Sequence, residues 1–525
     1  MASRKTARVL VIVLAAVSIT FVALAILLPI ARRELSNLVR RRSTEIVRER
    51  FQAEVTFGQF TIERLFPRVV ITGTKVSLTK GDHTNRAPLI FAASFSVSAE
   101  LAQFFRRPAH VHKLALSGMR ISVPPRGHQK QSNPTRVTQR YPVVIDAFQC
   151  SDCELNIFPR NPAKRPLRFS IHELEMKNVG LGRSAPYRAR LTNAVPKGEI
   201  HANGHFGPWQ PDDPSLTPLS GDYVFTHADL DPFPGIGGTL DSTGRFEGVL
   251  ERIVADGHTS TPDFSLDVSE RPVPLETQFH AIIDGTTGDT ALDPVRAKLL
   301  HSTIIARGGV FGMPDHKGRA VLLDVTVNPG RLEDILRLGV KSDRPPLIGG
   351  LRFHSQLAVL PGSRKVIQRL KLNGRFEADA AEPTNPAIRE KLARMSRRAK
   401  GKPGDKSAGT AVFDLNGRFL LNNAAARFPR MSFSIPGAQL DLSGEYGLYS
   451  ERLDFSGDLR LDAKLSQTFT GWKSLLLKPV DPFFRKHGKT VLPIRITGLR
   501  SEPKFQLQLH RGKEQAAEYQ VERLP

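Results

Sequence analysis

Residues 433–444 of the chain read Phe433-Ser-Ile435-Pro-Gly-Ala-Gln-Leu440-Asp-Leu442-Ser-Gly444. On each side of the Pro-Gly pair, apolar residues alternate with polar ones. This period of two is typical of strands in a β-sheet that has one apolar face, and proline and glycine mark the ends of such strands. The stretch therefore predicts two short strands separated by a Pro-Gly boundary.

The same alternation extends back along the chain to Val55, for example in Val321-Leu-Leu-Asp-Val325-Thr-Val327 and Phe95-Ser-Val97-Ser-Ala99. Long helices with apolar periodicity are nearly absent from this region. We therefore expect a mainly β fold with many short strands and one apolar sheet face. The residues that we expect to line that face are Phe225, Phe246, Phe264, Leu266, Val325, Val327, Phe376, Phe433, Ile435, Leu440 and Leu442.

A tripeptide of glycine, a basic residue and phenylalanine recurs in this region. It occurs at 204–206, 244–246, 374–376 and 417–419, so the members of each neighbouring pair lie 40 and 43 residues apart. The spacing fits a repeated unit of a few strands. Equally, a glycine two residues before a phenylalanine is common in any glycine-rich β protein.

The N-terminal segment has a different pattern. Residues 9–30 form an uncharged stretch of 22 residues, and a helix of that length would cross the apolar part of a bilayer. A signal peptide would have a shorter apolar stretch and a small-residue cleavage site, so we predict a retained transmembrane helix at 9–30 after a cytoplasmic segment 1–8. Its main apolar residues are Leu10, Ile12, Leu14, Ile19, Phe21, Leu24, Leu27 and Leu28.

A basic helix at 31–51, lying at the membrane interface, is expected to follow the span. This helix contains many arginines, so a simple count of the charges on each side of the span favours a main domain in the cytoplasm. However, long domains cross the membrane largely regardless of such charges. Charge alone therefore leaves the side of the membrane open.

Two further segments predict short helices. Residues 331–338 have helical spacing and end before Gly339. Asn385 and Pro386 are a cap and a first-turn residue for a helix at 387–399, with Ile388, Leu392 and Met395 on one face. The whole basic insertion, 385–409, could lie against a membrane or be solvated, and we favour the solvated interpretation.

Composition narrows the classes of function. The formal net charge is +24 and there are 2 cysteines, which excludes a disulfide-dense scaffold and permits an anionic partner. The basic residues are dispersed and no nucleic-acid motif occurs, so we expect neither nucleic acid nor nucleotide as a partner. The Gly488-Lys489-Thr490 triplet lacks the preceding glycine of a phosphate-binding loop, because Phe483 occupies that position.

No catalytic constellation is recognisable, and we expect a protein that is not an enzyme and has no cofactor. His110 and His112 would share a strand face but have no third ligand nearby, so a surface pair is favoured over a metal site. His227, Asp229 and Asp231 are interpreted as a polar strand edge before a turn. No metal ligand is therefore assigned.

Cys150 and Cys153 lie between two alternating segments, which predicts a hairpin turn at Ser151 and Asp152. Cysteines facing each other across such a turn could form a local disulfide in an oxidising compartment or remain thiols in a reducing one. A redox-active pair would instead open a helix after a strand. We therefore expect a structural pair.

Six segments together resemble the AsmA-like proteins, a bacterial envelope family within the bridge-type lipid-transfer group. They are 51–62, 67–73, 111–121, 221–230, 257–264 and 436–444, and the resemblance covers about residues 1–510. It implies an N-terminal β region at 52–220, a C-terminal β region at 221–510 and a tail at 511–525. It also implies an elongated, curved β-groove that is anchored in the inner membrane as a single-pass protein, with the bulk of the chain in the periplasm.

The family role implied by this resemblance is phospholipid transport between the inner and outer membranes and outer-membrane homeostasis. Expected partners are phospholipids, the membrane and other envelope proteins. An apolar groove would shield acyl chains from water, which costs about 0.8 kcal/mol per exposed methylene. The alternative is a non-transporting envelope scaffold or outer-membrane assembly factor, in which the same apolar residues would form ordinary sandwich cores.

Overall fold

The computed structural model describes residues 41, 44, 53–64, 68–80, 90–100, 109–123, 143–158, 166–180, 182–208, 210, 216–269, 271–313, 318–340, 344–405, 412–468, 485–486, 488–500 and 502–507. Within these residues the strands form one 27-stranded sheet, accompanied by a few short helices. The predicted mainly β class is confirmed.

The predicted span at 9–30 and tail at 511–525 lie outside the described residues, as does the basic helix at 31–51 apart from Arg41 and Thr44. None of the helices that the structure describes is both long enough and apolar enough to cross a bilayer.

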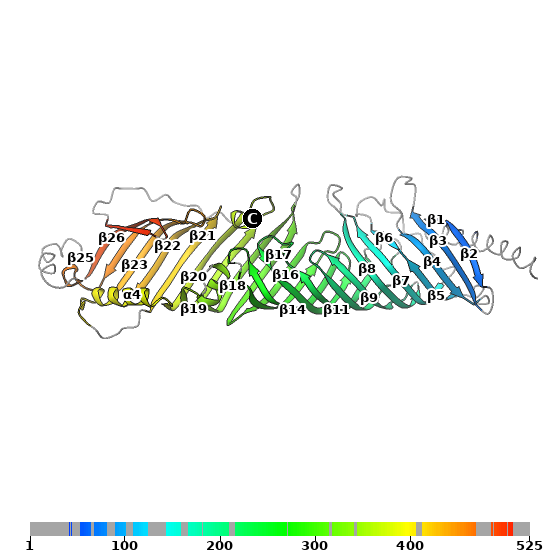
Figure 1. The fold of residues 1–525 in the computed structure, drawn as a ribbon, viewed down its shortest axis with the longest axis horizontal. Helices are drawn as coiled ribbons and strands as arrows, with labels where there is room; N and C mark the ends of the chain where they lie inside the picture. The colour runs from blue at the N-terminus through cyan, green and yellow to red at the C-terminus, as the bar shows by residue number, and fades with distance from the viewer. Residues whose placement is uncertain are drawn as a thin grey trace, which may run out of the picture. The chain divides into compact units, whose positions relative to one another are not determined.

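The chain divides into two compact units. Unit 1 comprises 1–194, 199–223 and 247–251, and unit 2 comprises 195–198, 224–246 and 252–525. Strands of unit 1 are drawn in blue to cyan in Figure 1. They are β1 (Ala53–Thr56), β2 (Gln59–Arg64), β3 (Val69–Lys80), β4 (Ile90–Ala99), β5 (Ala109–Ser117), β6 (Arg120–Val123), β7 (Val143–Ile157), β8 (Leu167–Gly180) and β9 (Ala185–Ala194).

Most neighbouring strands of unit 1 are antiparallel, but β5 and β6 both pair in parallel with β7. The same two strands pair antiparallel with β4, so they act as two halves of one interrupted strand. The interruption is at Gly118, which has a φ of +60°. A left-handed backbone costs glycine little, and it lets the chain bend without leaving the sheet.

Three strands contain residues of both units: β10 (Lys197–Phe206), β11 (Pro218–Asp229) and β13 (Thr239–Val249). The short strand β12 (Ile236–Gly237) lies within unit 2. The remaining strands belong to unit 2. They are β14 (Arg252–Leu266), β15 (Val273–Ile283), β16 (Thr290–Leu299), β17 (Ser302–Gly312), β18 (Arg319–Arg331), β19 (Leu347–Val359), β20 (Leu370–Pro383), β21 (Phe413–Asn422), β22 (Ala425–Ile435), β23 (Ala438–Gly447), β24 (Arg452–Leu461), β25 (Arg485–Lys486), β26 (Lys489–Leu499) and β27 (Glu502–Leu507).

From β14 to β24 each strand pairs antiparallel with the next, and β24 continues through β26 to β27. The sequential order follows from short connections, which favour antiparallel neighbours. Within unit 2, β20 to β23 are drawn side by side as oblique ribbons in Figure 1. Because apolar and polar residues alternate along each strand, the sheet therefore has one apolar face and one polar face.

The helices whose bounds the structure describes are short. They are α2 (Leu332–Gly339), α3 (Val366–Arg369), α4 (Pro386–Ala399) and the 3₁₀ turn η3 (Leu465–Thr468). The predicted helices at 331–338 and 387–399 are thus confirmed, with Asn385 accepting a hydrogen bond from the Ala387 N–H at 2.9 Å. Gly339 does not stop α2 as expected. It is the last helical residue, and extended Val340 ends the helix.

Two of the four Gly-basic-Phe tripeptides pair with each other. In the β20–β21 register Gly374 lies opposite Phe419, and Phe376 lies opposite Gly417. The two phenylalanine rings are 6.1 Å apart between centroids. At this point the tripeptides are cross-strand partners, and the Phe376 ring lies over the space that Gly417 leaves, with its Cζ atom 3.1 Å from where a Cβ atom would be.

Candidate functional site

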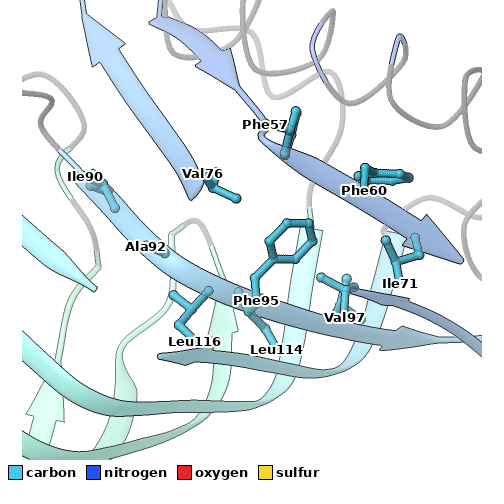
Figure 2. Close-up of a pocket in the computed structure, with 11 residues that line it drawn as sticks. Phe57, Phe60, Ile71, Val76, Ile90, Ala92, Phe95, Val97, Leu114 and Leu116 are labelled. Carbon is cyan, nitrogen blue, oxygen red and sulfur yellow. The ribbon is translucent and has the colours of Figure 1, made fainter. Parts of the chain in front are cut away.

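The candidate site is the apolar side of the sheet, which we describe separately in each unit. In unit 1 it contains a pocket of about 310 Å³. Figure 2 shows its side chains gathered from neighbouring strands. The lining residues are all apolar: Phe57, Phe60, Ile71, Val76, Ile90, Ala92, Phe95, Val97, Val111, Leu114 and Leu116.

Register explains why these side chains converge. Across β3, β4 and β5, Ile71 lies opposite Val97, and Val97 lies opposite Leu114. Directly opposed residues of antiparallel strands project from the same face. Each alternating strand thus adds its apolar side chains to the same surface, which we call the unit-1 apolar face.

Three phenylalanines form one wall of the pocket. The ring centroid of Phe57 is 5.8 Å from that of Phe60 and 6.0 Å from that of Phe95. The Phe95 ring lies over Gly73, where a Cβ atom would come within 2.3 Å of it. Only glycine leaves room for the ring at this position, so the pocket's shape depends on Gly73.

In unit 2 the same construction covers more strands. One row of directly opposed residues runs through Val327, Phe353, Phe376, Gly417, Met431, Leu442, Gly457 and Ile494. A second runs through Leu351, Ala378, Leu415, Phe433, Leu440, Leu459 and Leu492. We call the side that carries these rows the unit-2 apolar face.

The structure brings most of the predicted lining residues onto this face. Seven of them follow from the registers of β18 to β23: Val325, Val327, Phe376, Phe433, Ile435, Leu440 and Leu442. Phe264 lies opposite Val273, next to a bulge, and Leu266 lies opposite Ile236. Phe225 and Phe246 are half-buried residues of β11 and β13, for which no register places them on the face.

The side chains of both faces are mostly half-buried. Among the described residues, Leu299 is the largest fully buried side chain, and the next largest are Thr261 and Asp334. Phe353, Phe376 and Phe433 all keep part of their surface exposed. Two sheets packed face to face would bury such rings completely. The rings instead contact their neighbours within one layer.

Helices α2 and α4 cover one end of the unit-2 apolar face. Leu332 of α2 and Leu392 of α4 pack against a cluster that contains Phe413 and Ile435. Ala399, the last residue of α4, is buried with Leu461 of β24 and with Leu492 of β26. Both helices therefore lie across strand ends and leave the middle rows of the face uncovered by any described helix.

The opposite side of the unit-2 sheet is polar and is held by ion pairs between adjacent strands. Arg352 and Glu377 are 2.9 Å apart, and Arg495 and Asp454 are 3.2 Å apart. These pairs are exposed, so each contributes at most about 1 kcal/mol. Their main effect is to make this side hydrophilic, in contrast to the apolar face directly behind it.

The expectation of a hairpin at Ser151 and Asp152 is wrong. Cys150 and Cys153 lie within the single strand β7, and their sulfur atoms are joined in a disulfide. Strict alternation would send residues three apart to opposite faces. Asp152 has a φ of +53°, and this local irregularity brings both cysteines to the unit-1 apolar face, where they pack with Met119.

The histidine pair lies as the alternation predicts, with both rings near one carboxylate. Nδ1 of His110 and Nδ1 of His112 are each 3.7 Å from an oxygen of Asp146, and all three side chains are exposed. In the part of the chain that the structure describes, no cluster of His, Cys, Asp and Glu has an arrangement that could hold a metal ion.

The two remaining motifs lie where a strand meets a turn: His227 and Asp229 are at the end of β11, and Asp231 is in the turn that follows. The N–H of His227 donates to Asp241, and the N–H of Asp231 donates to Asp229. Gly488, with a φ of +81°, forms the turn between β25 and β26, and Lys489 pairs with Asp462 at 3.3 Å. The Gly-Lys-Thr triplet is thus the end of a hairpin turn followed by the first two residues of β26.

One ionisable group on the unit-1 apolar face is perturbed. Tyr187 of β9 lies opposite Met176, and burial together with the nearby Asp222 carboxylate raises its pKa to about 12. The phenol therefore stays neutral on this face across the physiological pH range.

Sequence reasoning missed the residues of the unit-1 pocket as lining candidates. Phe57, Phe60 and Phe95 lie in segments where apolar and polar residues alternate, so the signal was present. The sequence does not give the pairing register of the strands, and that register decides which apolar residues of neighbouring strands lie opposite each other.

The chain matches no family model, no curated protein and no solved structure.

Proposed function

We propose that this chain is a membrane-anchored, AsmA-like protein whose sheet curves into a groove that holds phospholipid tails. In this role it moves phospholipids between the inner and outer membranes and so maintains the outer membrane. The observation that carries the proposal is the pair of apolar faces, whose large side chains contact one another within one layer and remain half-exposed.

The energetics favour such a role. Each methylene exposed to water costs about 0.8 kcal/mol, so an acyl chain of roughly 14 methylenes faces a barrier of more than about 10 kcal/mol. Contact with a continuous apolar face removes most of that barrier. On the unit-2 face, Leu351, Phe353, Ser355 and Leu357 succeed one another along β19 at the spacing of a strand, so the face is on the order of 20 Å wide.

In this role the predicted span at 9–30 lies in the inner membrane and the two units lie in the periplasm. A periplasm-active reporter fused after Pro525 tests this topology. Activity of that reporter supports the placement, and activity of only a cytoplasm-dependent reporter at the same site contradicts it.

Site-specific photocrosslinking in cells tests the groove. A photoreactive phenylalanine analogue at Phe376 on the unit-2 apolar face should yield phospholipid adducts, detectable by mass spectrometry of the full chain. The same analogue at neighbouring Arg375, which projects from the polar side and is exposed, is the matched control. Equal labelling at both positions, or labelling at neither, would contradict the proposal.

One observation favours the alternative, an envelope scaffold or assembly factor. Among the described strand pairings, β27 pairs with β26 alone, all of its residues are exposed, and Phe505 and Leu507 are 69% and 56% exposed. An unpaired strand edge can add a strand from another protein. Recovery of a protein crosslinked at Phe505, without any lipid adduct at Phe376, would support this alternative over transport.

A further inference from the structure

Helix α4 has an apolar stripe that the fold only half covers. Ile388, Leu392, Met395 and Ala399 are spaced so that they share one side of the helix. Leu392 and Ala399 pack on the sheet. By contrast, Ile388 is 48% and Met395 is 51% exposed. Two large apolar side chains therefore project from a helix at the end of the unit-2 apolar face.

The helix is also strongly basic. Its sequence contains Arg389, Lys391, Arg394, Arg397 and Arg398 against the single acid Glu390. Arg389 pairs with Glu382 at 3.2 Å, and Arg394 lies 3.5 Å from Glu390. Lys391 and Arg398 are exposed and form no ion pair with any residue that the structure describes.

The position of α4 is fixed by contacts along its length. The Ser396 hydroxyl donates to the Pro436 carbonyl at 2.6 Å, and the Ala463 N–H donates to the Ala399 carbonyl at 2.9 Å. Because the helix is attached at these points, its exposed stripe is a built surface and not the side of a loose insertion.

We propose that α4 docks onto the surface of an anionic phospholipid bilayer, with Ile388 and Met395 entering the acyl region and Lys391, Arg394 and Arg398 contacting lipid phosphates. A basic helix with exposed apolar residues binds the interface in this way, through buried apolar area and attraction to anionic headgroups. The solvated interpretation of the 385–409 insertion leaves both exposed apolar side chains without a role.

This inference rests on the proposed lipid-transfer function and adds the site at which lipid enters or leaves. Leu392 and Ala399 connect the helix to the unit-2 apolar face, so a tail that leaves the bilayer beside α4 meets the end rows of that face directly. The same contact selects membranes that contain anionic lipids.

Vesicle capture tests the docking surface. The full chain is placed in phosphatidylcholine nanodiscs and mixed with vesicles of phosphatidylcholine, with or without phosphatidylglycerol. We expect capture of the anionic vesicles only. The variant K391S/R394S/R398S should capture them on the order of 100-fold more weakly, because each basic residue near an anionic surface contributes roughly fivefold. The variant I388S/M395S should lose about tenfold through reduced apolar burial.

The matched control removes three arginines elsewhere. Arg375, Arg418 and Arg430 form one exposed row on the polar side of β20, β21 and β22. The variant R375S/R418S/R430S loses the same charge and should capture anionic vesicles as the wild type does. Equal loss in both triple variants, or capture by K391S/R394S/R398S at the wild-type level, would overturn the docking proposal.

Photocrosslinking at Phe376 separates the two proposals. If the wild type captures anionic vesicles but gives no phospholipid adducts at Phe376, the groove proposal is contradicted and the α4 docking proposal is not. If phospholipid adducts form at Phe376 and all α4 variants capture vesicles as the wild type does, only the α4 docking proposal is contradicted.

Discussion

Phe376 lies directly opposite Gly417 in the β20–β21 pair, with its ring atom Cζ 3.1 Å from the position that a Cβ atom on residue 417 would occupy. The ring thus fills a space that the glycine leaves on the unit-2 apolar face. It also contacts Phe419 and Phe428, whose ring centroids are 6.1 Å and 6.4 Å away. A single layer of side chains is packed here by filling gaps between strands.

A valine at position 417 should therefore disturb that packing. Its side chain would meet the Arg430 carbonyl at 2.9 Å and the Met431 backbone at 3.2 Å, neither of which can move without shifting β22. We expect Gly417→Val to lower the free energy of unfolding by about 1–3 kcal/mol. Thermal unfolding followed by circular dichroism measures the change. Gly404→Val is the control, since nothing lies within 4 Å of its Cβ position, and an equal loss there would refute the packing argument.

The N-terminus of α2 depends on a buried carboxylate. Asp334 is 1% exposed and accepts hydrogen bonds at 2.9 Å from both the His301 N–H and the Ser302 hydroxyl. Asp334→Ala would leave the buried Ser302 hydroxyl without this acceptor, at a cost of about 1–3 kcal/mol, and would also remove the acceptor of the part-buried His301 N–H. We expect a fall in melting temperature well beyond that of the exposed control Glu390→Ala. Asp334→Asn, which keeps an acceptor, should lose less, and a neutral Asp334→Ala would contradict this role.

Acid should weaken the turn between β15 and β16. Burial alone would raise the pKa of Asp284, but hydrogen bonds from the Thr286 hydroxyl and from the N–H groups of Thr286 and Thr287 hold that pKa below its usual value. A lowered pKa in the folded state means that the stabilisation is present above the unfolded pKa and is lost as the pH falls through the folded pKa.

Asp284→Asn keeps the acceptor oxygen and removes the charge. We therefore expect it to be less stable than the wild type at neutral pH and equally stable in strong acid, where the wild-type carboxyl is protonated. Melting temperatures measured from pH 7 down through the carboxyl range give the difference. A constant gap between the two proteins at all pH values would show that ionisation of Asp284 makes no contribution.

A charge on the apolar face should reduce lipid contact. Leu440 lies opposite Phe433 and Leu459 on the unit-2 face, beside the end that α4 covers, and is half-buried. Leu440→Glu places a carboxylate where an acyl chain would lie, at a desolvation cost of a few kcal/mol, so photolabelling by lipid at Phe376 should fall by more than about fivefold. Ser443→Glu, on the polar side of the same strand, is the control and should leave labelling unchanged.

The predictions that the structure confirms are those that depend on interactions between residues close together in the sequence. Asn385 and Pro386 mark the start of α4, because a side-chain acceptor and a residue without an N–H both suit the first turn of a helix. The hairpin expected at Ser151 failed because a period-two pattern contains no sign of a residue with positive φ, such as Asp152, which keeps β7 continuous.

By itself, the sequence determined that the chain is built of strands with one apolar side, because alternation such as that in Leu440-Asp-Leu442 commits each side chain to a face as soon as a strand forms. Only the tertiary structure decided which rows meet, since a shift of one residue in any register would turn a strand's apolar side chains away from its neighbour's. It also decided that those side chains stay half-exposed, because burial depends on whether a second layer covers the sheet, and that is a property of the whole fold.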